Sequence, residues 1–173
     1  MYRGIVSVLA GVLAVGALFH SSPALAAPRQ QTTIVDVALA ANAETGEFSI
    51  LIAALLAADP AVLETLDARG QRTVFAPTDA AFVDLLGELG VSAEDLLADQ
   101  ALVTQVLLYH VVPGRRDSTS VIGARRLRTL NGGFLAQSGG VLTDANGRTS
   151  NIVATDIAAD NGIIHVIDRV VLP

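Results

Sequence analysis

The chain has 173 residues, 51% of them hydrophobic, which is enough for one domain with a substantial core and excludes a disordered chain. Its net charge is −6 and its densest arginine cluster, Arg125, Arg126 and Arg128, is short, so nucleic acid is not expected as a partner. Cysteine is absent, which excludes disulfides, thiolate metal sites and a lipoprotein anchor.

The N-terminal segment is typical of a secretory signal peptide. Arg3 precedes an apolar or small run from Ile5 to Phe19, and Ala24-Leu25-Ala26 supplies a small-x-small cleavage pattern. That run is shorter than the roughly 20 residues that a membrane-spanning helix needs. We therefore expect residues 1–26 to be cleaved, 27–31 to form a short extension, and the exported protein to be extracellular or periplasmic, without stable membrane insertion.

Helical periodicity follows. Apolar residues recur at i, i+3, i+4 and i+7 from Ile34 to Ala41 and again from Phe48 to Leu56, with a turn over 42–46 between them. Asp59-Pro60 is an N-cap followed by proline at the first helical position, so a short helix begins there. We expect Gly70 to end that helix.

Cap signals continue toward the middle of the chain. After a brief strand over Thr73–Phe75, Thr78 should cap a helix that ends near Gly90. Ser92 with Asp95 resembles a capping box, and Asp99 should cap the next helix.

Beyond His110 the pattern changes to short β-type runs. Asn131-Gly132-Gly133, Gly139-Gly140, Asn146-Gly147 and Asn161-Gly162 separate these runs at spacings typical of hairpins. Helices first and strands later, without βαβ alternation, predict an α+β domain with a mainly antiparallel sheet.

Three motifs in this order resemble the fasciclin domain family. "TVFAPTDAAF" (73–82) is similar to the first signature segment of that family, "YHVVPG" (109–114) to its tyrosine-histidine motif, and "NGIIHVIDRVVLP" (161–173) to its second signature. The similarity runs from about Thr32 to Pro173. It implies a fasciclin-like fold, with N-terminal helices packed on a β-sandwich or wedge.

The signature residues also have a structural interpretation. Thr78 and Asp79 suit the first turn of a helix, and Phe82 suits the core beneath it. Asn161 and Gly162 suit a turn. In the strand that follows, both faces are mostly apolar, so we expect it inside the sheet and His165 buried, neutral and hydrogen-bonded, with ligand contact or catalysis as the alternatives.

Catalysis has little support in the residue pattern. The sequence has no Gly-x-Ser-x-Gly elbow, no cysteine nucleophile and no phosphate-binding glycine loop. Only two histidines, His110 and His165, lie beyond the signal peptide, and the aspartates lack calcium-loop spacing, so no metal site is expected. We expect neither an enzyme nor a cofactor.

The resemblance implies a function in adhesion. In animal members, an Asp-Ile pair before the second signature and the tyrosine-histidine segment are implicated in integrin recognition. Asp156-Ile157 and Tyr109-His110 occupy the matching positions, and the partner would be a protein or polysaccharide of a cell surface or matrix. The alternative for Asp156-Ile157 is an ordinary turn with a buried Ile. The alternative for the whole protein is binding of an apolar small molecule such as a carotenoid.

Overall fold

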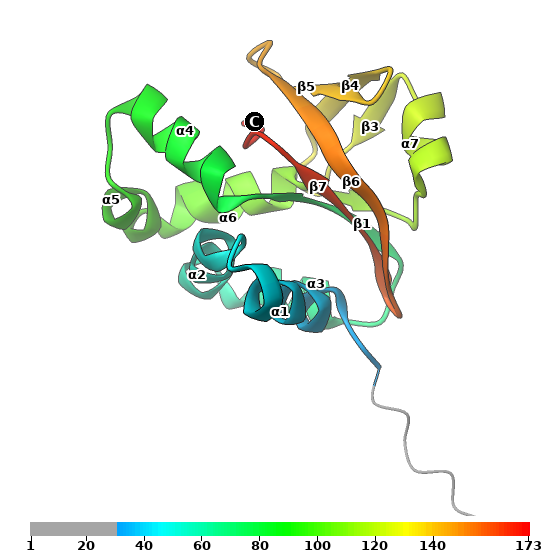
Figure 1. Ribbon diagram of the computed structural model, residues 1–173, viewed down its shortest axis with the longest axis horizontal. Helices are drawn as coiled ribbons and strands as arrows, with labels where there is room; N and C mark the ends of the chain where they lie inside the picture. The colour runs from blue at the N-terminus through cyan, green and yellow to red at the C-terminus, as the bar shows by residue number, and fades with distance from the viewer. Residues whose placement is uncertain (1–30) are drawn as a thin grey trace, which may run out of the picture.

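A computed structural model describes residues 31–173, so the expected signal peptide and most of the N-terminal extension lie outside the described residues. Helices and strands alternate little along the chain (Figure 1). The helices are α1 (Ile34–Thr45), α2 (Ser49–Ala57), α3 (Pro60–Asp67), α4 (Asp79–Leu89), α5 (Ala93–Ala98), α6 (Gln100–Tyr109) and α7 (Ser118–Gly123). The strands are β1 (Arg72–Pro77), β2 (Val111–Pro113), β3 (Arg126–Arg128), β4 (Phe134–Ser138), β5 (Val141–Thr143), β6 (Thr149–Ala159) and β7 (Gly162–Ile167).

The strands form one sheet in the order β2-β1-β7-β6-β5-β4-β3, and every neighbouring pair is antiparallel except β1 with β7. The expected α+β class and mainly antiparallel sheet are therefore confirmed. So is the interior position of the closing strand, because β7 lies between β1 and β6. The parallel pair was not expected, and it places the first signature segment directly beside the second, with Phe75 opposite His165.

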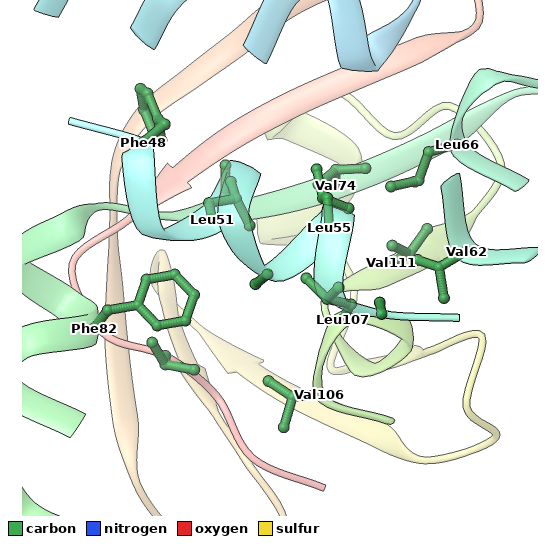
Figure 2. Packing of buried hydrophobic residues seen from close by; sticks show 14 of the residues in the cluster. Phe48, Leu51, Leu55, Val62, Leu66, Val74, Phe82, Val106, Leu107 and Val111 are labelled. Carbon is green, nitrogen blue, oxygen red and sulfur yellow. The ribbon is translucent and has the colours of Figure 1, made fainter. Parts of the chain in front are cut away.

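The sheet curls along the long strand β6, so that β3–β5 fold over one face of β1 and β7 while the helices α1–α6 lie toward the other (Figure 1). Alternate residues of the central strands consequently enter two different cores. Val74 and Val166 belong to the core beneath the helices, and Figure 2 shows part of that cluster, with side chains of α2, α3 and α6 gathered around Val74. Phe75 and Ile167 belong to the second core, between the two halves of the sheet.

Local capping explains most helix boundaries. The capping box of Ser92 and Asp95 and the caps at Asp59, Thr78 and Asp99 are all formed as expected. A capping box that the sequence analysis missed, Thr33 with Asp36, begins α1.

Three helix expectations were wrong. α1 continues to Thr45 and so includes most of the turn expected over 42–46, and Gly46 ends it with a φ of 71°. α3 ends at Asp67 rather than at Gly70, because Ala68 already adopts an extended backbone. The short helix α7 lies within the segment that was expected to contain only strands, and Asp117 caps it through the backbone N–H of Ser120.

Within residues 31–173, no single helix is long and apolar enough to cross a membrane. α2 and α3 together reach the required length and composition, but they are bent by 116°. Their buried residues Leu51, Leu55 and Val62 pack in the core beneath the helices, which accounts for the apolar character of α2 and α3.

Candidate functional site

Asp156 lies within β6 at an irregularity of the sheet, so the alternative of an ordinary turn was wrong. The pairing register of β6 with β7 shifts between Ala154 and Ile157, and Asp156 has a φ of 62°, the single positive φ among the non-glycine residues that the structure describes. Aspartate tolerates this left-handed conformation better than most residues, because its short side chain can hydrogen-bond locally. The bulge turns the exposed Asp156 out of the regular pleat.

The Asp156 carboxylate binds the start of α7. Its Oδ1 accepts a hydrogen bond from the Ser118 backbone N–H at 2.8 Å, and its Oδ2 accepts one from the Ser118 hydroxyl at 2.5 Å. These hydrogen bonds to Ser118 hold the pKa of the Asp156 carboxyl below its usual range. The carboxylate is therefore ionised near neutral pH, exposed, and fixed in direction.

His165 supports the same bulge from inside the protein. Its side chain is fully buried, and its Nδ1 accepts a hydrogen bond from the Asp156 backbone N–H at 3.3 Å. Its Nε2 lies 2.9 Å from the Arg116 carbonyl oxygen, which can only accept, so the ring is a neutral imidazole with its proton on Nε2. The ring also stacks on Phe75, with the centroids 5.7 Å apart. His165 thus joins β7, β6 and the segment that leads into α7.

Ile157 lies beside Asp156 but has a different environment. It is half-buried, pairs with Ile164 of β7, and packs against the core beneath the helices. Only part of its side chain is accessible.

Tyr109 and His110 are in the interior, which rules out direct contact with a partner while the domain is folded. Tyr109 is fully buried; its hydroxyl donates to the Phe134 carbonyl at 2.7 Å and accepts from the Ala145 backbone N–H at 3.1 Å. Burial raises the pKa of that hydroxyl. A Cβ at Gly133 would lie 2.7 Å from the Tyr109 ring, so glycine is needed where this loop crosses the ring.

The His110 side chain uses both ring nitrogens within the domain. Its Nδ1 donates to the Val106 carbonyl at 2.7 Å, and its Nε2 accepts from the Val171 backbone N–H at 3.2 Å. Burial lowers the pKa of His110 to about 4, so the ring is neutral over the physiological range. Tyr109 and His110 therefore tie α6 to the loops and to the C-terminal segment.

The other signature residues connect separate parts of the fold. Thr78 caps α4, and Phe82 is buried, as expected. Asp79 was expected only to suit the first turn of its own helix, but its carboxylate also accepts hydrogen bonds from the backbone N–H groups of Ser49 at 3.1 Å and Ile50 at 2.8 Å. It therefore caps α2, a contact that helix periodicity could not indicate.

The β6–β7 turn makes similar connections. The buried Asn161 accepts from the Ile34 backbone N–H at 2.8 Å and donates to the Leu66 carbonyl at 2.7 Å, which joins the beginning of α1 to the end of α3. A Cβ at Gly162 would overlap the carbonyl oxygen of Arg72 in the neighbouring strand. These two residues are thus accounted for by packing.

Chemical groupings typical of metal centres are not found among the described residues, where no set of three or more His, Asp or Glu side chains converges.

An apolar cavity of about 180 Å³ lies between α4, α5, α6 and the C-terminal segment. His110 is the one residue of its lining with a polar side chain, and both nitrogens of that ring are already hydrogen-bonded. The cavity can therefore offer a ligand only apolar contacts.

Comparison with known proteins identifies the family. The model of the fasciclin domain matches residues 46–173, and this chain belongs to that family. The helix α1 precedes the matched region, yet its buried Ile34 packs in the same core.

Individual relatives agree with that assignment. The protein sll1483 of Synechocystis is 39% identical over 153 residues, covering 86% of this chain and 77% of the relative. The immunogenic protein MPT70 of Mycobacterium tuberculosis is 31% identical over 139 residues, covering 80% and 68%. A solved FAS1 domain pair from the insect cell adhesion molecule Fasciclin I has a similar fold, with a TM-score of 0.60 and 23% identity over 74% of this chain and 46% of that one.

Proposed function

We propose that this fasciclin domain is a secreted, non-enzymatic attachment module that binds a protein or polysaccharide of a cell surface or matrix through a surface that includes Asp156 and part of Ile157. Membership of the family supports adhesion, since a solved member comes from an insect cell adhesion molecule. The observation that carries the proposal is the exposed, ionised Asp156 carboxylate on a bulge that two different elements hold in place.

The physical basis is preorganisation. A binding residue that is already fixed loses little conformational entropy when a partner arrives. Asp156 is fixed through its side chain by Ser118 and through its backbone by His165. Each of its carboxylate oxygens accepts one hydrogen bond from Ser118, and a carboxylate oxygen has a further lone pair for a partner cation or N–H donor.

The test separates the charge of Asp156 from its structural role. Asp156→Asn keeps a side chain that tolerates positive φ and can still accept from Ser118, but it removes the charge. Attachment of the purified protein to cells or envelope material of its source should fall several-fold, with the melting temperature nearly unchanged. Asp84→Asn, an exposed aspartate on α4, is the matched control for loss of one negative charge and should attach like the wild type. Equal attachment by Asp156→Asn and wild type would remove Asp156 from the binding surface.

A second function, binding of an apolar small molecule, is favoured by the cavity of about 180 Å³. A cavity of roughly 150 Å³ lined by apolar side chains holds benzene. The cavity therefore suits a small hydrocarbon or one end of a longer molecule, and a whole carotenoid would have to extend beyond it.

Protein purified from its native source should then carry a bound apolar compound, visible as absorbance if it is a chromophore or by mass spectrometry of an organic extract. Addition of benzene to the emptied protein should raise the melting temperature, and Ala54→Leu, which fills the cavity, should abolish that rise. Clean protein with no response to benzene would refute this second function.

A further inference from the structure

The charges of this acidic protein are unevenly distributed along the fold. Residues 31–114, which include α1–α6, contain 12 Asp and Glu but only two arginines, whereas residues 115–143 contain five arginines and one aspartate. Within residues 31–173, the ion pairs join Glu88 to Arg148 and Arg169, so the arginines of β3 have no carboxylate partner there. Arg115 lies at the β6–β7 turn, where it donates to the Ala159 and Gly162 carbonyls, so three of these arginines, Arg125, Arg126 and Arg128, lie in or next to β3. An anionic partner is therefore attracted to these three, at the β3–β5 end, and repelled by the acidic helical part of the domain.

The strands at that end present an outer face that points away from the second core. Leu127, Leu135 and Leu142 point into the second core, so their neighbours in sequence point outward. The pairing registers arrange those neighbours in three cross-strand rows: Arg128–Phe134, then Arg126–Ala136–Thr143–Thr149, then Ser138–Val141–Asn151. The rows contain no acidic residue; Asp168 borders them beyond Asn151, which donates to it at 2.7 Å.

The cationic end of this face has a defined geometry. The guanidinium of Arg126 lies over the ring of Phe134, 4.2 Å from its centroid, and Arg128 stands directly opposite Phe134 in the ladder. Phe134 is 43% exposed although it is a large apolar residue. Arg126 and Arg128 are exposed as well, so a partner can reach both guanidinium groups and the ring.

We infer that this outer face, which we call the β3–β6 face, binds an acidic polysaccharide whose sugar carboxylates pair with Arg126 and Arg128 while a sugar ring contacts the part of Phe134 that Arg126 leaves exposed. Guanidinium groups match carboxylates in two-pronged geometry, and an aromatic ring provides a flat apolar surface. Apart from Val141, the remaining positions are alanine or carry a hydroxyl or amide group, which suits a polymer rich in hydroxyl groups. Nucleic acid would need a longer basic stripe, and a membrane would need more protruding apolar side chains.

The inference adds to the proposed attachment function a second surface, separate from Asp156, and depends on that function for its biological setting. Binding of polygalacturonate, a polymer with one carboxylate per sugar, can be measured by affinity electrophoresis and calorimetry of the full exported protein. The Arg126→Gln/Arg128→Gln double variant should bind about tenfold more weakly. Phe134→Leu should weaken binding several-fold, and Arg69→Gln, an exposed arginine in the acidic half, should have no effect. Binding should also weaken as salt rises above about 0.1 M, where charges are screened beyond about 10 Å.

Each control has an outcome that would overturn the inference. Equal binding of the fully methyl-esterified polymer would show that carboxylates are not recognised. An equal loss in Arg69→Gln would indicate a diffuse effect of net charge. Binding to phosphatidylglycerol vesicles but not to the polymer would indicate a membrane surface instead. If no polymer binds while Asp156→Asn still reduces attachment, the polysaccharide inference fails and the proposed attachment function stands.

Discussion

The buried His110 should make the stability of this domain depend on pH. In the unfolded chain a histidine has a pKa of about 6.5, whereas burial lowers the pKa of His110 to about 4 in the folded protein. The unfolded state therefore binds a proton more readily than the folded state between these values. Folding stability should be at its full value above pH 7 and should decline as the pH falls from about 6.5 to about 4.

The size of the effect follows from the shift. One pKa unit corresponds to about 1.4 kcal/mol, so between pH 7 and pH 4.5 the titration of His110 should remove about 2.5 kcal/mol from the free energy of unfolding. That loss is a large part of the roughly 5–15 kcal/mol that holds a domain together. At pH 4.5 most carboxylates are still ionised, so their contribution to the change is small.

Urea unfolding of the wild type and of His110→Gln at the two pH values measures this directly. Glutamine carries a donor and an acceptor but does not titrate near these pH values, so the variant should be less stable at pH 7 and should lose much less on acidification. The quantity of interest is the difference between the two pH-dependent losses, because it cancels the contributions of other groups. If both proteins lose the same free energy, His110 is not buried as a neutral imidazole and the reasoning is wrong.

Three further predictions follow. Gly162→Ala should destabilise the domain by several kcal/mol, because the added Cβ would overlap the Arg72 carbonyl. Gly87→Ala, in a helix with open space around it, should instead stabilise the domain by about 0.5–1 kcal/mol. Thermal melting of the two variants measures both effects. His165→Ala should lower the melting temperature by several degrees, because it leaves buried hydrogen-bonding groups without a partner, each costing about 1–3 kcal/mol; full stability with loss of binding would make His165 a binding residue. Intact-mass analysis of the exported protein should show a chain that begins at or next to Ala27, and a mass that retains Met1 would contradict the secreted assignment.

The sequence predicted the parts of the fold that local chemistry determines. The caps at Thr78 and Asp99 and the interior position of the closing strand were all correct, because short-range hydrogen bonds and apolar periodicity decide them. The parallel pairing of β1 with β7 was not predicted, since no local signal indicates which distant strand a buried run will join. α7 was missed because its 6 residues contain little apolar periodicity.

The candidate site shows the same division. Family resemblance selected Asp156 and Ile157, but the bulge, the positive φ and the hydrogen bonds to Ser118 depend on the register of β6 against β7. Resemblance also selected Tyr109 and His110 as contact residues, and the structure places both in the interior. A family motif identifies residues but does not indicate whether their side chains are exposed or buried. The packing of the folded domain determines that.

The position of β7 has a consequence for how the domain forms. This strand comes last among the described elements and yet lies in the interior of the sheet, where each residue pairs with a residue of β1 that is 90 positions earlier in the sequence. Pairing over such sequence separations closes a long loop before it gains contacts, which makes folding slow. The sheet cannot be completed until β7 has been synthesised. For the secreted protein proposed above, this late step favours passage through a membrane before folding, because a chain without β7 cannot complete the sheet.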